Sequence, residues 1–324
     1  MKCLVTGHSG LIGSDLVDLL LSHGHDVYGI SSSSRNENLK CKNYYIDLKD
    51  TYKSKEVIES IAPEIVYALA ADASEIKSLF SPIKVTKDNI DVFLNTLVPS
   101  LNSSNLKRVI FASSAAVYGN IESPFKETDI PNPQDIYGIS KLTNENFLKV
   151  MSQAHGFEFV IVRPHNVFGP RQRMNDPYRN VVTLFMNNIL RNEQYTIYGK
   201  GEMKRCFSYS KDVADVIYQC GFKNVADMTF NVGSDTSYSL QELSDMVREI
   251  SKTSLTPKYL PLRPKEIGSV ILDHKLQNNN FDYKNTNIIE ALKTTWEWAK
   301  TQGQQEYKYT KLEINNKLVP DNWK

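Results

Sequence analysis

Short apolar runs alternate with amphipathic segments along the first 165 residues of the chain. The runs are rich in β-branched and aromatic side chains, which favours strands, and the longer segments between them repeat apolar residues at helical spacing. Regular alternation of strand and helix predicts a parallel sheet covered on both faces, and right-handed crossovers make it doubly wound. The predicted strands are Cys3–Thr6, Val27–Ile30, Tyr44–Ile46, Ile65–Leu69, Val109–Ala112 and Phe159–Val162, and the predicted helices are Leu11–Leu21, Lys55–Ile61, Pro82–Leu101 and Ile136–Ala154.

The pattern becomes less regular after Pro164. Proline, asparagine and arginine cluster in residues 169–180, and helical periodicity then returns with short strands between the helices. We therefore expect an α/β domain over residues 1–165, joined by returning segments near 205–235, and a smaller, interleaved lobe over residues 166–324. The tail after Gly303 is polar and poorly patterned, and no function is predicted for it. The later helices are Val181–Arg191, Lys211–Phe222, Leu240–Ile250 and Thr286–Thr301.

Charge and composition exclude several classes of protein. The chain has 324 residues with 38 Lys+Arg and 37 Asp+Glu, a net charge of +1, which predicts no nucleic-acid or membrane partner. The first apolar run is too short for a signal peptide, and no run approaches the roughly 18 apolar residues of a membrane span. The four cysteines are scattered and the histidines lack ligand spacing, apart from His23 and His25 in a predicted turn. We expect a cytoplasmic protein with neither a disulfide framework nor a metal site.

Residues 7–13 read Gly-x-x-Gly-x-x-Gly and lie between the first predicted strand and the first predicted helix. Glycines at these positions permit a tight turn, close approach of the backbone to a pyrophosphate, and close packing of helix on strand. The helix N-terminus adds free N–H groups and the positive end of the helix dipole. The motif therefore predicts a dinucleotide site of the Rossmann type. The expected contacts are Gly7, Ser9, Gly10, Leu11, Ile12 and Gly13.

The choice between NAD and NADP depends on the end of the second strand. NAD enzymes usually carry an acid there for the ribose 2′-hydroxyl. This chain has Ser31 at that position, so no carboxylate repels a 2′-phosphate, and Arg35 nearby can neutralise one. The residues favour NADP only slightly, and both cofactors stay open.

Tyr137 and Lys141 lie four residues apart on a predicted helix, and therefore on one face of it. A free tyrosine has a pKa near 10, but a nearby ammonium group and a cationic nicotinamide ring favour the phenolate. The fifth strand is followed by Ser113 and Ser114, at the sheet edge where ligands of such folds bind. A hydroxyl group there would share a site with Tyr137 and the nicotinamide.

These motifs, in this order and spacing, resemble the extended short-chain dehydrogenase/reductase family, and within it the NAD-dependent nucleotide-sugar epimerase/dehydratase group. The resemblance rests on Gly-x-x-Gly-x-x-Gly, on Ser-Ser-x-x-Val-Tyr-Gly at 113–119 and on Tyr-Gly-x-Ser-Lys at 137–141. It extends over about residues 1 to 300. Further matches lie at residues 163–171, which resemble the substrate loop of the family, and at 205–214, 231–233 and 263–266.

The resemblance implies a role for each matching position. Ser114 matches the catalytic hydroxyl, Tyr137 the base, and Lys141 the partner of that base. Arg205 and Arg263 offer forked donors for diphosphate oxygens, a pattern similar to that of enzymes for UDP-sugars. Further cofactor contacts are implied for Tyr137 and Lys141 themselves and for Asp47, Leu48, Leu69, Ala70, Ala71, Asn89 and Pro164. Substrate contacts are implied for Ser114, Asn166, Asn180, Arg205, Arg263 and Glu266.

The two residues after Ser114 bear on the reaction. Sugar 4,6-dehydratases of the family carry Asp-Glu there, and decarboxylases that make pentose nucleotides keep the Glu, whereas this chain has Ala115 and Ala116. Epimerase–reductases carry Cys at position 115 and His at the position of Arg171, and glucuronate 4-epimerases usually carry Thr at that of Asn166. The remaining Ser-Tyr-Lys set suits a 4-epimerase of a UDP-hexose, either UDP-glucose/UDP-galactose or the N-acetyl forms. The expected reaction is transient hydride transfer from C4 to bound NAD(P), with the tyrosine as base.

Three features depart from the pattern of the family. Ser31 replaces the acid expected for NAD, Cys206 replaces an acid in the usual Arg-Asp-Phe triplet, and Asp72 and Ser74 stand where some hexose epimerases have a lysine near the sugar. Val270, at a position that gates acetamido sugars in the family, would leave room for an N-acetyl group.

Two other functions stay open. An NADP-dependent nucleotide-sugar reductase or dehydrogenase would consume external cofactor, and a non-catalytic dinucleotide-binding sensor would need only the glycine loop. The resemblance also implies a homodimer, formed by packing the Tyr-x-x-x-Lys helix and the helix before it into a four-helix bundle.

Overall fold

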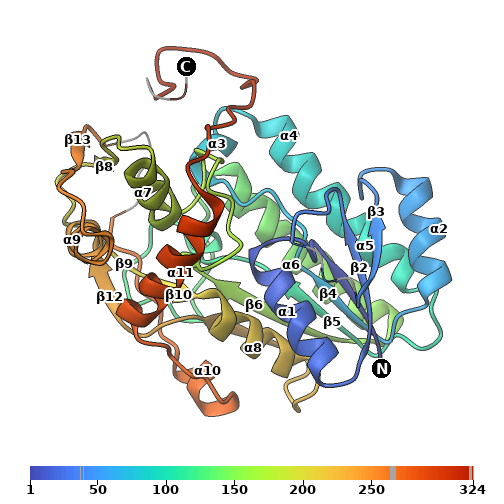
Figure 1. The fold of residues 1–324 in the computed structure, drawn as a ribbon. Coiled ribbons are helices and arrows are strands. Elements are labelled where there is room, and N and C mark those ends of the chain that lie inside the picture. The colour runs from blue at the N-terminus through green and yellow to red at the C-terminus, as the bar shows by residue number, and fades with distance from the viewer. Residues whose placement is uncertain (37, 39, 263–267, 321–322, 324) are drawn as a thin grey trace.

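The computed structural model describes residues 1–36, 38, 40–262, 268–320 and 323, and its centre is a seven-stranded parallel sheet (Figure 1). The strand order β11-β6-β5-β4-β1-β2-β3 runs outward from β1 in both directions, as in a doubly wound sheet. The prediction of a Rossmann-type α/β fold is confirmed. The strands are β1 (Lys2–Thr6), β2 (Asp26–Ser31), β3 (Lys42–Tyr45), β4 (Ile65–Ala68), β5 (Arg108–Ala112), β6 (Glu158–Pro164) and β11 (Met228–Val232).

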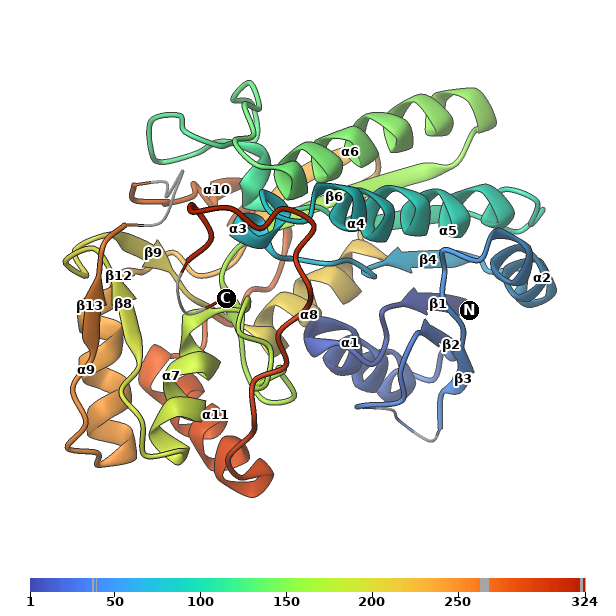
Figure 2. The same ribbon diagram turned by 90° about the horizontal axis from the view of Figure 1, so that it is seen from above.

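Successive side chains of each strand point to opposite faces of the sheet and pack into two apolar cores, one on each face. In β1, Cys3 and Val5 join the core under α1 and α8, whereas Leu4 joins the core on the opposite face. Figure 2 shows α1 and α8 on one side of the sheet and α5 and α6 on the other. The helices of this part are α1 (Leu11–Ser22), α2 (Thr51–Ile61), α3 (Glu75–Ser78), α4 (Pro82–Thr86), α5 (Val92–Ser100), α6 (Ile136–His155) and α8 (Ser210–Cys220).

The helix predicted over Pro82–Leu101 is interrupted by a π-helical turn, Lys87–Asp91, which joins α4 to α5. Such a turn inserts an extra residue into the helical repeat. Helix α2 begins four residues earlier than predicted, because the side chain of Asp50 accepts a hydrogen bond from the backbone N–H of Lys53 at 3.1 Å.

The later part of the chain builds a core of its own. Phe185 of α7, Leu243 of α9 and Trp296 of α11 pack together there. Two elements from the same part of the sequence return to the sheet: β11 pairs with β6, and α8 packs on α1. The boundary near residue 165 stays a prediction. The elements are β7 (Val167–Phe168), α7 (Val181–Leu190), β8 (Thr196–Tyr198), β9 (Lys204–Cys206), β10 (Ser208–Tyr209), β12 (Ser237–Ser239), α9 (Leu240–Ser251), β13 (Lys258–Leu260), α10 (Lys275–Asn280) and α11 (Ile288–Gln302).

Within the described ranges, no helix combines the length and apolar character needed to cross a membrane. The cytoplasmic location stays a prediction.

Candidate active site

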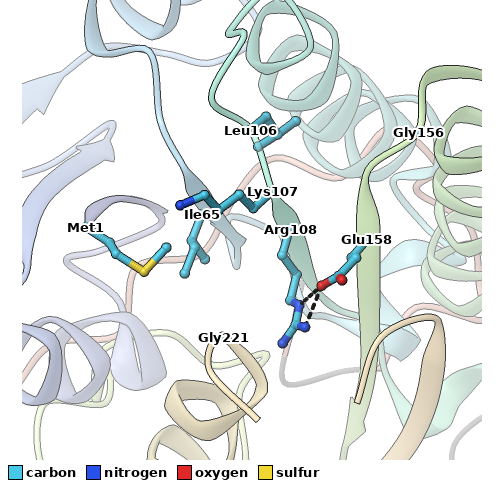
Figure 3. A pocket seen from close by; sticks show the side chains of 8 residues that line it. All are labelled: Met1, Ile65, Leu106, Lys107, Arg108, Gly156, Glu158 and Gly221. Carbon is cyan, nitrogen blue, oxygen red and sulfur yellow. Dashed lines mark hydrogen bonds and ion pairs between the residues drawn. The ribbon is translucent and has the colours of Figure 1, made fainter. Parts of the chain in front are cut away.

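The predicted site residues that the structure describes, apart from Asn89, all line a cleft of about 1130 Å³ at the carboxyl ends of the sheet strands. A second hollow, of about 380 Å³, lies at the opposite edge, where β4, β5 and β6 begin. Figure 3 shows Arg108 in that hollow, donating two hydrogen bonds to Glu158. The lining of this hollow contains none of the predicted site residues, so the first cleft is the candidate active site.

The glycine loop has the geometry of a phosphate-binding turn. Gly7 has φ +72°, and a Cβ at Gly13 would lie 2.3 Å from the carbonyl oxygen of Gly7, so that helix α1 can approach β1 only without a side chain there. Helix α1 begins at Leu11, and its N-cap, Gly10, supplies no side-chain hydrogen bond to the first N–H groups. Those groups are the donors that a pyrophosphate requires, so the loop fits a dinucleotide. Gly7, Ser9, Gly10, Leu11, Ile12 and Gly13 all line the cleft.

Ser31 and Arg35 lie beside this loop. The hydroxyl oxygen of Ser31 is 2.6 Å from that of Ser9, and Arg35 Nη2 donates to the backbone carbonyl of Ser9 at 3.5 Å. Burial, together with the charges of Arg173 and Arg179, lowers the pKa of Arg35 to about 10. Arg35 thus places a cation next to the phosphate loop, which suits an anionic ligand.

The remaining predicted cofactor contacts separate into two groups. Asn89 is buried in the π-helical turn, where its side-chain amide donates to the carbonyls of Val85 at 2.8 Å and Asp72 at 3.3 Å. Asn89 is absent from the described lining of the cleft, and its assignment to the cofactor stays a prediction. The residues that do line the cleft are Asp47, Leu48, Leu69, Ala70, Ala71 and Pro164.

Ser114, Tyr137 and Lys141 meet in the floor of the cleft. Tyr137 is hydrogen-bonded to Ser114, and Lys141 lies one helical turn further along α6. Lys141 Nζ donates to the carbonyl of Ala112 at 2.7 Å and is 5.8 Å from the centre of the Tyr137 ring. All three predicted catalytic side chains are buried and close together.

Burial sets the protonation of this group when no ligand is bound. It raises the pKa of Tyr137, against the hydrogen bond from Ser114, which lowers it. It also lowers the pKa of Lys141 to about 7, against the attraction of Glu145. The phenol is therefore protonated in the free protein. A bound cation would lower the pKa of Tyr137 and favour the phenolate, whereas an uncharged ligand that excludes water would favour the neutral phenol.

A buried ion pair supports the catalytic residues from below. Glu145 Oε2 lies 2.6 Å from Arg163 Nη2, and Glu145 Oε1 accepts a hydrogen bond from Ser113 at 2.5 Å. The side chain of Arg163 also donates to Tyr118 at 2.8 Å. Glu145 and the neighbouring Asn144, whose polarity alone would place them at the surface, are both buried. The network joins the ends of β5 and β6 to helix α6.

The predicted substrate residues lie at the far wall of the cleft. Asn166, with φ +41°, donates to the carbonyl of Cys206 at 3.2 Å, and Asn180 caps α7 by accepting from the N–H of Val182 at 3.1 Å. Arg205 lines the same wall and pairs along the backbone with Val270. Arg263 and Glu266 lie outside the described residues.

His165 is a cleft residue for which the sequence analysis gave no role. It follows β6 directly, lines the cleft and is buried. Among the described residues, neither of its ring nitrogens has a hydrogen-bond partner. Burial, together with the charges of His274 and Arg205, lowers the pKa of His165 to about 3. The histidine is therefore a neutral donor and acceptor on the lining of the cleft, and its position after the sixth predicted strand was the available signal.

Lys77 is a second cleft residue that the sequence analysis missed. Its Nζ lies 2.5 Å from Asp72 Oδ2, and both side chains are buried. Burial opposes ionisation of Asp72, but the charges of Lys77 and Arg179 hold the pKa of that carboxyl below its usual range. Some hexose epimerases of the family have a lysine near the sugar at the positions of Asp72 and Ser74. In this chain Lys77 of α3, a few residues further along, brings a lysine to the cleft.

Comparison with known proteins identifies the family. The model of the NAD dependent epimerase/dehydratase family matches residues 3–233. The chain belongs to this family. The resemblance drawn from the glycine loop, the Ser-Ser motif and the Tyr-x-x-x-Lys pair is therefore confirmed.

Relatives within the family carry out more than one reaction. A UDP-glucose 4-epimerase from Thermotoga maritima, solved with UDP-glucose, is 30% identical and covers 93% of this chain and 99% of its own, with a TM-score of 0.88. A UDP-N-acetylglucosamine 4-epimerase from Methanobrevibacter ruminantium, in complex with UDP-N-acetylmuramic acid, is 32% identical and covers 93% and 98%, with a TM-score of 0.86. A UDP-N-acetyl-alpha-D-glucosaminuronate decarboxylase from Bacillus cytotoxicus is 29% identical and covers 80% and 83%.

Membership of an NAD-dependent family fits the glycine loop, which has the open helix N-terminus that a dinucleotide needs. The slight preference for NADP, drawn from Ser31 and Arg35, stays a prediction.

Proposed function

We propose that this family member is a 4-epimerase of a UDP-hexose. One observation carries the proposal: Ser114, Tyr137 and Lys141 meet in the cleft floor, and positions 115 and 116 beside them carry buried alanines. A dehydratase or decarboxylase of the kind described above needs an acid at one or both of those positions. The site therefore provides for proton exchange at one hydroxyl group and for no further acid–base step at 115 and 116.

The reaction at C4 of the sugar requires removal of a proton from O4 and of a hydride from C4. The glycine loop would hold NAD, which would supply the hydride acceptor for C4 and then the hydride donor. Tyr137, as phenolate, takes the O4 proton and gives it back after the sugar has turned. Ser114 donates a hydrogen bond to O4 and stabilises the carbonyl that develops there. The Lys141 ammonium, held by the carbonyl of Ala112, favours the phenolate form of the base.

Epimerisation also requires that the keto sugar present its other face to the same reacting atoms. The substrate must then be held by its nucleotide part while the sugar turns. We assign this holding to Asn166, Asn180 and Arg205, and to Arg263 and Glu266, with Ser114 contacting the sugar. Val270, which lines the cleft beside Arg205, leaves room for an N-acetyl group in this assignment.

The adenosine end of the cofactor contacts Ser31 and Arg35 in this proposal. A serine near the ribose 2′ position and a guanidinium beside the phosphate loop allow NADP to bind as well as NAD. That observation supports an NADP-dependent nucleotide-sugar reductase as a second candidate function. A reductase would consume one cofactor per product, whereas the epimerase restores its cofactor in every cycle.

We further propose a homodimer formed through α5 and α6, which lie side by side on the outside of the molecule (Figure 2). Helix α6 exposes Ile139, Phe147 and Val150, and the neighbouring helices expose Ile83 and Val98. Exposed apolar side chains on one face mark a protein interface. Light scattering of the wild type and of Val150→Glu tests this: a dimer mass that falls to that of the monomer in the variant supports it, and a monomeric wild type contradicts it.

Proton NMR of the anomeric signals tests the function. The protein is incubated with UDP-glucose and, separately, with UDP-N-acetylglucosamine, each with catalytic NAD. We expect galacto-configured signals that grow past the amount of cofactor. Absence of new signals with both sugars would contradict the epimerase proposal, and consumption of NADPH with a 4-keto sugar would then favour the reductase.

A further inference from the structure

The segment after Gly303 crosses the cleft rather than hanging free. Figure 1 shows it leaving the end of α11 and passing between α7 and α3, and Figure 2 shows the same course from above. The sequence analysis predicted no function for this segment, and the family resemblance ends at about residue 300. We call residues 304–320 and 323 the C-terminal strap.

The first part of the strap is fixed to α7. The carbonyl of Gln305 accepts from Asn187 Nδ2 at 2.9 Å and from Arg191 Nη1 at 3.2 Å. The backbone N–H of Gln305 donates in return to Asn187 Oδ1 at 3.0 Å, and Tyr307 Oη donates to Asn188 Oδ1 at 2.7 Å. These hydrogen bonds hold the start of the strap on the substrate side of the cleft.

The far part of the strap is fixed to the sheet domain. Val319 and Trp323 are buried against Phe80, between α3 and α4. The carboxylate of Glu313 accepts from the backbone N–H groups of Ile83 at 2.9 Å and Lys84 at 2.8 Å, at the start of α4, where a negative charge is favourable. The strap therefore connects the two walls of the cleft.

The middle of the strap forms part of the cleft itself. The N–H of Lys308 donates to the carbonyl of Asn175 at 2.8 Å, and Tyr178 Oη donates to the carbonyl of Thr310 at 3.4 Å. The Tyr309 ring packs edge-on against that of Tyr178, with 6.4 Å between centroids. Tyr307, Lys308, Tyr309 and Thr310 all line the same cleft as Ser114 and Tyr137.

We propose that the C-terminal strap is a substrate-binding element that contacts the nucleoside diphosphate part of the ligand. Lys308 brings a cation and Tyr309 an aromatic ring to the lining, which match an anionic diphosphate and a flat base. Arg205, assigned above to the nucleotide, lines the same cleft. The identity of the ligand rests on the proposed function, but the role of the strap is measured through nucleotide binding alone.

Calorimetric titration with UDP tests the proposal on four chains: the wild type, Lys308→Ala, Tyr309→Ala and a chain that ends at Gly303. Lys311→Ala is the matched control, because Lys311 is an exposed strap lysine outside the described lining of the cleft. We expect Kd for UDP to rise about fivefold or more in each single variant, which corresponds to roughly 1 kcal/mol, and further in the shortened chain. The control should stay within about twofold. KM for the UDP-sugar should rise with kcat nearly unchanged.

Unchanged Kd in both Lys308→Ala and Tyr309→Ala would overturn the proposal, and these two variants decide it even where the shortened chain fails to fold. Circular dichroism melting shows that each variant is folded. If the wild type binds UDP more tightly than the strap variants but epimerises neither UDP-hexose, the function proposed above fails and the strap proposal stands. If the wild type epimerises and the strap variants bind UDP equally well, the strap proposal fails alone.

Discussion

Lys141 Nζ lies 5.8 Å from the centre of the Tyr137 ring and is fixed there by the carbonyl of Ala112. In the proposed mechanism Tyr137 is the proton acceptor for O4, so Tyr137→Phe should reduce epimer formation by at least about 100-fold. The affinity for UDP should stay within about twofold, because the variant keeps the ring. NMR of the anomeric signals and UDP titration measure the two effects. Tyr52→Phe, at a largely exposed tyrosine on α2, is the control, and a fully active Tyr137→Phe would contradict the assignment.

The two neighbouring serines, Ser113 and Ser114, are expected to have different roles, one in supporting the fold and the other in catalysis. Ser114 is hydrogen-bonded to Tyr137, whereas Ser113 donates to the buried Glu145 at 2.5 Å. Ser114→Ala should lower kcat about 10- to 100-fold with little change in the melting temperature. Ser113→Ala removes a hydrogen bond from the buried carboxylate of Glu145, which should lower the free energy of unfolding by about 1–3 kcal/mol and so lower the melting temperature. It should affect kcat less than Ser114→Ala does. Equal effects of the two substitutions on kcat would contradict this division.

The pKa of Lys141 gives a prediction about stability and pH. Burial lowers this pKa to about 7 in the folded protein, whereas an unfolded lysine has a pKa near 10.4. The cost of burying the charged amine is therefore fully present below pH 7 and fades as the pH rises from 7 toward 10.4.

In the cofactor-free protein, Lys141→Met should raise the melting temperature most at pH 6, and this advantage should shrink by pH 9. Lys53→Met, at an exposed lysine, is the control and should show no such trend. A constant difference between wild type and Lys141→Met from pH 6 to 9 would show that the amine stays charged in the fold.

The cofactor choice is tested at Arg35, whose guanidinium lies beside the phosphate loop. Arg35→Ala should weaken NADP binding about tenfold and NAD binding about twofold or less, because only NADP carries the 2′-phosphate. Arg35→Lys keeps the charge and should fall between the two. Titration of cofactor-stripped protein gives the four affinities, and equal losses for NAD and NADP would remove Arg35 from the ribose site.

The local motifs could be predicted because each is fixed by short-range geometry. The glycine loop must follow β1, and Tyr137 and Lys141 must share a face of α6, so these residues meet wherever the sheet forms. The resemblance implies a cofactor contact for Asn89, and that assignment stays a prediction; what the sequence pattern did not predict is the π-helical turn in which the Asn89 amide donates to the carbonyls of Val85 and Asp72.

The missed features depend on partners that are distant in the sequence. Glu313 caps α4 from 230 residues away, and nothing near either position indicates that contact. The burial of Glu145 requires Arg163 from the next strand. The buried pair of Lys77 and Asp72 requires helix α3, which the short, polar sequence of that segment does not predict. Long-range pairing of this kind is decided by the packing of the whole chain rather than by local pattern.

The return of the hydride to the carbon that lost it is the central claim of the account. Deuterium placed at C4 of the UDP-hexose tests it in one experiment with wild-type protein and catalytic cofactor. The account predicts that the epimer formed carries the deuterium at C4, with none in solvent and no growth of absorbance at 340 nm. Loss of the deuterium to solvent, or its accumulation in free reduced cofactor, would contradict internal return and with it the proposed 4-epimerase.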